Sequence, residues 1–290
     1  PVLAGRPRTV EELSGGLTNH NLLVTTPGGA FVARCNQSDT GLLGIDRDAE
    51  HLNTRLAAQA GVGAPVLGYR PDLGILVIGY IDGVTYDNAT FQRPGIVARA
   101  ATACRKLHAG VPFVNEFDMF ARQRNYLSIV HERGFALPPG YEDFDPRFRQ
   151  VRAALEARPA RRVPCNNDLL AGNFVDDGDK LWLIDYEYSG NNDPCFELGN
   201  ISTECDLDPD QLEELVTVYF GRRSRSRIAR TRLQALVSQY GWSLWGAIQA
   251  ATSPLDFDFH SWCMERYDRA ASGFTSSGFT RLVDEAQRDD

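Results

Sequence analysis

The sequence has no apolar run long enough to cross a membrane. No stretch of its 290 residues approaches the ~18–20 uncharged apolar residues of a transmembrane helix. The first residues combine no basic start with a following apolar stretch, so we expect no signal peptide. Internal repeats and low-complexity tracts are missing too. With 43% hydrophobic and 23% charged residues, the composition excludes collagen-like, disordered and coiled-coil chains and predicts a globular protein.

Paired cysteine motifs are also absent. None of the six cysteines belongs to a CxxC pair, and most have apolar neighbours in the sequence. We therefore expect buried free thiols in a reducing cytoplasm, not disulfides or zinc ligands. The cysteines are Cys35, Cys104, Cys165, Cys195, Cys205 and Cys263.

The sequence also lacks an excess of positive charge. Thirty Lys and Arg residues stand against thirty-eight Asp and Glu residues, which gives a net charge of −8. A field of this sign repels nucleic acid and anionic membranes, so we expect neither as a partner. The arginine-rich run 222–232 has no interleaved aromatic residue, and we interpret it as a solvated loop and helix start. Nothing in the sequence indicates an oligomeric state.

The order of the predicted elements indicates an α+β chain with two lobes. Strands are predicted over 31–35 and 73–80, and a helix over 46–60. Later helices are predicted over 95–108, 119–133, 147–157, 195–203, 210–219, 228–250 and 257–271. A short β-rich island over 173–175 and 180–185 interrupts them, with a turn at 176–179. We expect a small β-rich lobe over 1–80, a hinge near 79–83 and a larger helical lobe over 81–290, with a small-molecule site between them.

The stretch from Pro164 to Glu187 carries the clearest chemical signal. Asp168 and Asn173 form the pattern D-L-x-x-x-N just before a predicted hairpin, and Asp185 ends its returning strand. Two carboxylates and an amide oxygen that converge in this way suit Mg²⁺ and leave one carboxylate free to accept a hydroxyl proton. Each residue alone is as well explained by a turn, but the combined pattern favours the functional interpretation.

This stretch resembles the catalytic signature of kinases of the eukaryotic type, and in detail the choline/ethanolamine kinase family, which is close to the aminoglycoside phosphotransferases. The resemblance implies a bilobal protein-kinase-like fold that uses ATP and Mg²⁺. It places Asp168 at the catalytic-base position, Asn173 and Asp185 at the metal positions, and Glu187 near the metal through water. One departure is Asn166, where the family pattern usually has His.

The resemblance also assigns residues of the small lobe. The glycine turn with Gly15, Gly16, Thr18 and Asn19 would cover the nucleotide phosphates, although a plain hairpin turn is the alternative. Arg34 takes the position of the phosphate-pairing lysine of kinases, and an Arg can bridge phosphate oxygens with two hydrogen bonds. The helix that follows offers two carboxylates to orient this Arg, Glu50 and, as the alternative, Asp48.

Aromatic residues supply the expected substrate pocket. Trp242 and Trp245 lie on one face of a predicted helix. They occupy, together with Trp262, positions at which proteins resembling choline kinases build an aromatic box, and Tyr188 and Glu204 match its remaining wall. π faces with one carboxylate suit a quaternary ammonium group, which has no N–H to donate. Packing into the core is the alternative role for these rings.

The resemblance implies ATP-dependent phosphorylation of the hydroxyl of a small cationic amino alcohol, choline first. Alternatives are a kinase for another small alcohol, such as ethanolamine, a thiamine-like alcohol or an aminoglycoside, and a catalytically silent kinase-like protein that binds choline. A binding module unrelated to kinases would explain the aromatic residues but not the set of Asp168, Asn173 and Asp185. Asp193 is expected to have a structural role first, with substrate contact as the alternative.

Overall fold

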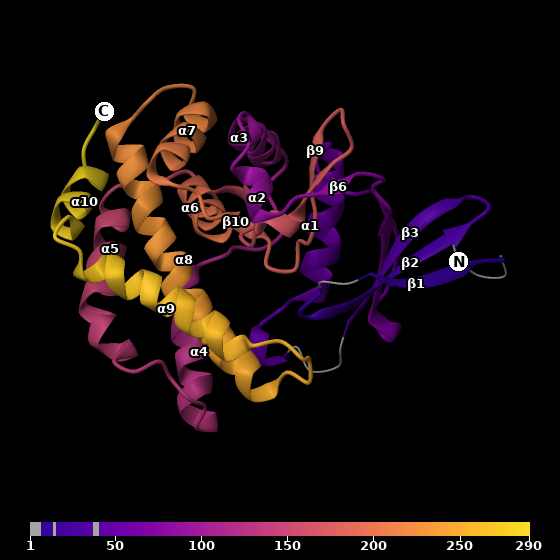
Figure 1. Ribbon diagram of the computed structural model, residues 1–290, viewed down its shortest axis with the longest axis horizontal. Helices are drawn as coiled ribbons and strands as arrows, with labels where there is room; N and C mark the ends of the chain where they lie inside the picture. The colour runs from indigo at the N-terminus through magenta and orange to yellow at the C-terminus, as the bar shows by residue number, and fades with distance from the viewer. Residues whose placement is uncertain (1–6, 14–15, 37–40) are drawn as a thin grey trace.

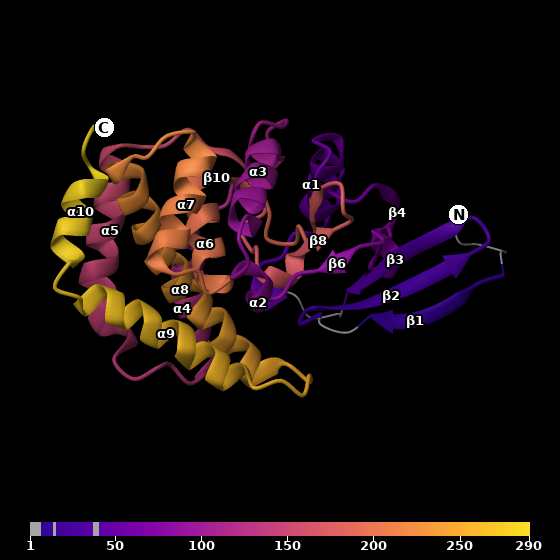
Figure 2. The same cartoon turned by 45° about the horizontal axis from the view of Figure 1, so that its top comes forward.

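The computed structural model describes residues 7–13, 16–36 and 41–290, which form an N-terminal sheet and a larger helical part (Figures 1 and 2). Five antiparallel strands form the sheet in the order β1-β2-β3-β5-β4. Their bounds are Thr9–Leu13, Asn19–Thr26, Gly29–Asn36, Val66–Arg70 and Ile75–Gly79 for β1 to β5. The two predicted strands correspond to β3 and β5, whereas no bounds were predicted for β1, β2 and β4.

The sheet and its helix bring two predicted site residues together. Arg34 lies in the central strand β3, opposite Asn21 of β2 and Leu76 of β5. Helix α1, Arg47–Gln59, begins after Asp46, whose side chain accepts two backbone N–H bonds at the helix start. Glu50 is on its buried face, so α1 directs a carboxylate toward the sheet.

The helical part is built around one long helix. Helix α8, Arg225–Thr252, is buried over most of its length and packs against α4, α6, α9 and α10. A Cβ atom at Gly246 would lie 2.8 Å from the Trp262 ring, so this glycine allows α9 to approach closely. The other helices are Asn88–Phe91 (α2), Ile96–His108 (α3), Met119–Arg133 (α4), Asp145–Ala157 (α5), Pro194–Glu204 (α6), Pro209–Phe220 (α7), Phe259–Thr275 (α9) and Phe279–Ala286 (α10). Of all these, α2 and α10 were not predicted from the sequence.

Short strands within the helical part hold the D-L-x-x-x-N segment. Strands β6, β8 and β9 form one small sheet, and β7 pairs with β10 in another. Their bounds are Val84–Thr85 (β6), Val163–Cys165 (β7), Phe174–Asp176 (β8), Leu181–Leu183 (β9) and Gly190–Asn192 (β10). The predicted hairpin over 173–185 is thus β8 and β9, while β6, β7 and β10 were not predicted. Asp168 precedes this hairpin and Asp185 follows it.

This architecture confirms the predicted fold class, with a small β-rich N-terminal lobe and a larger helical lobe. The boundary near 79–83 stays a prediction, although β5 belongs to the first sheet and β6 pairs with β8. None of the helices in the described residues is both long and apolar enough to span a membrane. All six cysteines are described as free thiols, five of them buried and Cys35 partly buried.

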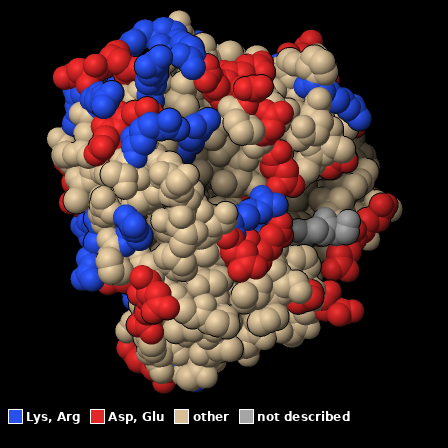
Figure 3. All heavy atoms as spheres, turned by 60° about the vertical axis from the view of Figure 1, so that its left-hand side comes forward, with Lys and Arg blue, Asp and Glu red and all other residues tan. Residues whose placement is uncertain are grey.

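The arginine-rich run differs from its prediction at one position. Arg230 is 6% exposed, and its Nε atom lies 2.6 Å from Oδ2 of Asp193, so it is a buried ion-pair partner and not a solvated residue. Arg230 lies in the second turn of α8, on the face that packs against α6, and the charge pattern of the run did not indicate its burial. Figure 3 shows one face of the molecule, where basic side chains gather toward the upper edge among acidic ones.

Candidate active site

Residues from both lobes line a cavity of about 90 Å³. The cavity is lined by Gly16, Leu17, Thr18, Asp168, Leu170, Asn173, Asp185, Glu187, Tyr188, Glu204, Trp242, Trp245 and Trp262. Four larger surface hollows among the described residues, of about 190 to 630 Å³, share none of these residues. The structure therefore brings together the predicted catalytic, metal and substrate residues. Leu17 and Leu170 were not predicted, and Gly15 lies outside the described residues.

Helix α6 holds the loop that carries Asp168. Glu197 is fully buried, and its two carboxylate oxygens accept the backbone N–H groups of Asn166, at 2.8 Å, and Asn167, at 2.6 Å. Asn200 accepts the backbone N–H of Leu169 at 2.7 Å. Asn167 has a positive φ of 69°, which these bonds hold in place. Sequence reasoning missed Glu197 and Asn200, and the only signal for them is a polar pair inside the otherwise apolar segment 194–201.

His108 of α3 contacts Glu197, which together with Asn200 clamps the loop of Asp168 through the hydrogen bonds described above. Its Nε2 atom lies 3.4 Å from Oε1 of Glu197 and 3.5 Å from Sγ of Cys165. These three side chains offer potential metal-ligating atoms within 4.8 Å of one another. However, Nδ1 of His108 is 2.7 Å from the Tyr219 hydroxyl, and both Glu197 oxygens already accept backbone N–H groups. These hydrogen bonds indicate support for the loop.

Asn166 connects Asp168 to Asp185. Its side-chain amide donates to the backbone carbonyls of Ile184, at 3.0 Å, and Asp185, at 2.8 Å. Its side-chain oxygen accepts the backbone N–H of Asp168 at 3.1 Å. Asn166 thus uses both ends of its amide to hold the two carboxylate-bearing segments together.

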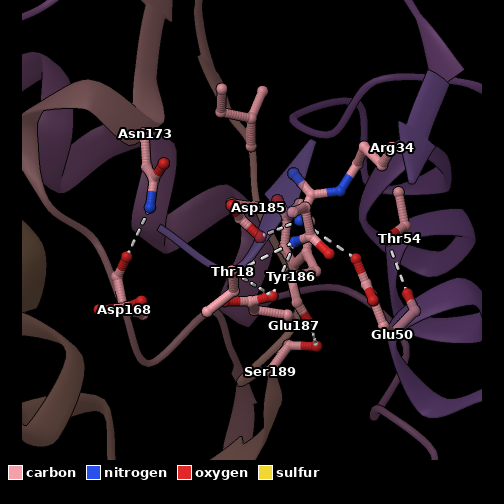
Figure 4. Close-up of polar contacts among 12 residues, drawn as sticks. Thr18, Arg34, Glu50, Thr54, Asp168, Asn173, Asp185, Tyr186, Glu187 and Ser189 are labelled. Atoms are coloured by element: carbon pink, nitrogen blue, oxygen red, sulfur yellow. Dashed lines mark hydrogen bonds and ion pairs between the residues drawn. The ribbon is translucent and has the colours of Figure 1, made fainter. Parts of the chain in front are cut away.

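The residues predicted to bind metal lie around Asp168 (Figure 4). The Asn173 side-chain N–H donates to the backbone carbonyl of Asp168 at 2.7 Å. This bond fixes the amide and leaves its oxygen available. Burial raises the pKa of Asp168 well above its usual range, with repulsion from Glu204, Glu187 and Asp185 as further causes. Carboxylate and amide oxygens of this kind are the ligands that Mg²⁺ prefers.

Arg34 lies between two carboxylates. Its Nη2 atom lies 2.5 Å from Oδ1 of Asp185 and 3.2 Å from Oε1 of Glu50 (Figure 4). Burial opposes the charge on Arg34, but Asp185 and Glu50 together raise the pKa of this guanidinium above its usual range. Asp48, the alternative partner, instead accepts the Tyr69 hydroxyl at 2.7 Å. The geometry therefore favours Glu50 as the carboxylate that orients Arg34.

Glu187 joins the glycine turn to the helical lobe. It accepts the Thr18 hydroxyl at 2.7 Å, the Asn19 amide at 2.9 Å and Nη1 of Arg47 at 3.2 Å. Arg47 also donates to Glu50 at 2.7 Å. Burial, together with the nearby Asp185 and Glu50 carboxylates, raises the pKa of Glu187 to about 7. Arg47 was missed by sequence reasoning because an Arg in the first turn of a helix is ordinarily exposed.

The predicted aromatic residues form one continuous wall. The Trp245 indole N–H donates to the Tyr188 hydroxyl at 2.8 Å. Ring centroids are 4.8 Å apart for Tyr188 and Trp242, and 5.0 Å apart for Trp245 and Trp262. Tyr188, Trp242 and Trp245 are each at most 5% exposed, yet they line the cavity. These rings therefore pack into the core and face the site at once.

Glu204 also lines the cavity, but it is not an isolated anion. Both of its carboxylate oxygens contact Arg266 of α9, one of them 3.2 Å from Nε and the other in close contact with Nη2. Arg266 was not predicted as a site residue. Asp193 does not line this cavity, because its carboxylate caps α6 and pairs with Arg230.

Comparisons with known proteins agree with this fold. A family model described as choline/ethanolamine kinase matches residues 10–214. A choline/ethanolamine kinase family protein of known structure from Mesorhizobium loti is 36% identical, with a TM-score of 0.86 over 99% of this chain and 95% of that one. Choline kinase LicA from Streptococcus pneumoniae is 25% identical, with a TM-score of 0.81 over 94% and 95%. A probable ethanolamine kinase from Arabidopsis thaliana is 26% identical over 90% of this chain and 78% of its own length.

Proposed function

The chain belongs to the choline/ethanolamine kinase family, and we propose that it transfers the γ-phosphoryl group of ATP to the hydroxyl of choline. The observation that carries this proposal is a single cavity in which Asp168 and Asp185 lie beside three tryptophans and Tyr188. The carboxylates suit phosphoryl transfer, and the rings suit a methylated cation.

Asp168 acts as the general base in this proposal. Its carboxylate accepts the hydroxyl proton of the alcohol as the oxygen attacks the γ-phosphorus in line. The O–H bond of the alcohol breaks and a P–O bond to its oxygen forms. The bond between the γ-phosphorus and the β,γ-bridging oxygen breaks, and ADP leaves with its electron pair. The clamp of Glu197 and Asn200 on the loop positions this carboxylate, since the backbone N–H groups on both sides of it are held.

Phosphate recognition is assigned to the small lobe. The turn with Gly16, Thr18 and Asn19, together with Gly15 outside the described residues, covers the phosphates. Arg34, oriented by Glu50, pairs with phosphate oxygens. Asn173 and Asp185 would hold Mg²⁺, with Glu187 in support through water, and a bound ion would supply positive charge next to the phosphates. We accordingly propose that residues 1–80 form the nucleotide lobe and residues 81–290 the catalytic lobe.

The small amino alcohol binds against Tyr188, Trp242, Trp245 and Trp262, with Glu204 at the edge. The LicA relative supports choline and the Arabidopsis relative supports ethanolamine, and the aromatic wall favours the more methylated of the two. The intact set of Asp168, Asn173 and Asp185 argues against a silent binding protein. The free thiols of the chain suit a reducing cytoplasm, where we place the reaction.

Measurement of ADP release tests this proposal. The purified protein, ATP and Mg²⁺ are assayed with choline, ethanolamine, a thiamine-like alcohol and an aminoglycoside. We expect the fastest release with choline and slow release with the aminoglycoside, whose many polar groups the aromatic wall does not match. Release that none of the four alcohols stimulates contradicts the kinase assignment, and release stimulated most by the aminoglycoside contradicts the choice of substrate.

A further inference from the structure

The positively charged side chain of Arg266 lies behind the aromatic wall of the cavity. The guanidinium carbon of Arg266 is 3.3 Å from the centroid of the Trp262 ring, which is one helical turn earlier on α9. The same guanidinium contacts both oxygens of Glu204. A cation stacked on an aromatic ring and paired with a carboxylate is the arrangement expected for a bound ammonium ligand, but here the protein supplies the cation itself.

The ion pair is buried on both sides. The side chain of Arg266 is 11% exposed and that of Glu204 is 3% exposed. Glu204 ends α6 and Arg266 belongs to α9, so the fork of two contacts also ties these helices together. Breaking the pair would leave a buried charge without a partner, which is strongly unfavourable. We therefore expect Arg266 to stay in place when substrate binds.

The other acidic side chains of the cavity are committed to the reacting end. Asp168 is the proposed base, Asp185 is paired with Arg34, and Glu187 accepts hydrogen bonds from Thr18, Asn19 and Arg47. On the aromatic side, Trp245 already donates to the Tyr188 hydroxyl. An ammonium group with three N–H donors finds few available acceptors there, whereas a trimethylammonium group needs none.

We propose that Arg266 is a specificity-determining residue, which cancels the charge of Glu204 so that the pocket selects N-methylated amino alcohols over primary ones. The inference rests on the proposed kinase function and adds a cause for its substrate preference. The preference arises because the paired Glu204 gives no net attraction to a primary ammonium, and the ring faces and apolar surface reward methyl groups.

Substitution of the charge tests this inference. Arg266→Met leaves Glu204 anionic beside the pocket, so ethanolamine gains a partner. We expect the ratio of kcat/KM for choline to that for ethanolamine to fall by about tenfold or more, the scale of one charge-assisted hydrogen bond. The change should lie in KM for the alcohols, with KM for ATP unaltered. An unchanged ratio overturns the inference.

Two further variants separate charge from a merely structural role. In Arg266→Met with Glu204→Gln the site is neutral again, and the choline preference should return to within about threefold of wild type. Because this double variant buries no unpaired charge, it carries the test even where the single variant fails to fold. A double variant that still favours ethanolamine overturns the inference, as does one that loses activity equally with both alcohols.

A matched control lies one turn further along α9. Arg269→Met removes an exposed arginine that pairs with Asp206 and Glu265 outside the cavity, and the substrate ratio should not move. A similar shift in this control overturns the inference, because it would show that loss of any positive charge on α9 changes the substrate ratio. Wild-type protein that phosphorylates neither alcohol would contradict the proposed function, whereas an active wild type with unmoved ratios contradicts only the role of Arg266.

Discussion

The side-chain amide of Asn166 donates to the backbone carbonyl of Asp185 at 2.8 Å, across a separation of 19 residues. The same side chain accepts the backbone N–H of Asp168. One asparagine therefore connects the loop of the proposed base to the segment of the proposed metal ligand. Because a buried asparagine has both a donor and an acceptor to place, its hydrogen bonds hold the backbone segments of these two carboxylates in a fixed relation.

Loss of this connection should reduce turnover without preventing ATP binding. In Asn166→Ala the carbonyls of Ile184 and Asp185 lose their donor, and each buried unpaired group costs about 1–3 kcal/mol. We expect kcat to fall by about tenfold to a hundredfold, with little change in KM for ATP, since small misplacements of reacting groups are costly. Steady-state kinetics would check this, and an unaltered kcat would contradict the positioning role.

Removal of the proposed base should affect chemistry far more than binding. For Asp168→Ala we expect kcat to fall by ~10²–10⁴, the usual scale for a general base. ATP should still bind because Arg34 and Glu50 are untouched. Asp185→Ala should in addition weaken Mg²⁺-dependent ATP binding, which titration calorimetry measures. Wild-type turnover by Asp168→Ala would show that another group accepts the proton.

Exchange of Arg34 for lysine tests its fork of hydrogen bonds. Arg34→Lys keeps the charge but loses the planar donor pair that matches phosphate oxygens. It also weakens the simultaneous contact with Glu50 and Asp185. We expect a higher KM for ATP and an unchanged apparent affinity for choline. An unchanged KM for ATP would limit Arg34 to a structural role.

The aromatic wall should order the substrates by methylation. Each aromatic face contributes ~0.5–2 kcal/mol to a desolvated cation, and each buried methyl carbon adds about 0.8 kcal/mol. We expect kcat/KM to fall from choline to dimethylethanolamine to ethanolamine. Trp245→Ala should flatten this series, mainly by raising KM for choline. Equal use of choline and ethanolamine by the wild type would contradict the aromatic box but not the kinase assignment.

The ion pair between Asp193 and Arg230 should contribute to stability and not to catalysis. In Asp193→Ala the buried Arg230 loses its partner, and breaking such a pair costs about 3–5 kcal/mol. Urea unfolding measures the expected loss. Glu156→Ala removes an exposed pair with Arg152 on α5 and serves as the control, with no measurable change expected. A fully stable Asp193→Ala variant would contradict the structural assignment.

Much of the fold follows from local pattern. Helical spacing over 46–60 and 119–133 predicts α1 and α4 almost to the residue, because each has an aspartate at its start and glycine just beyond its end. The short strands β7 and β10 escaped prediction, since three-residue strands carry too little alternation to be recognised. Their pairing depends on neighbours that lie far away in the chain.

The sequence by itself determined the family, through the pattern that contains Asp168, Asn173 and Asp185, and it also indicated the aromatic residues of the pocket. Only the tertiary structure decided which charges meet. Arg47 reaches Glu187 across 140 residues, and Arg266 reaches Glu204 across 62. The spacing of residues along the chain does not predict such pairs, because burial and three-dimensional geometry decide which charges meet. The pairing of Glu204 with Arg266 therefore depends on the packing of α6, α8 and α9 around the cavity.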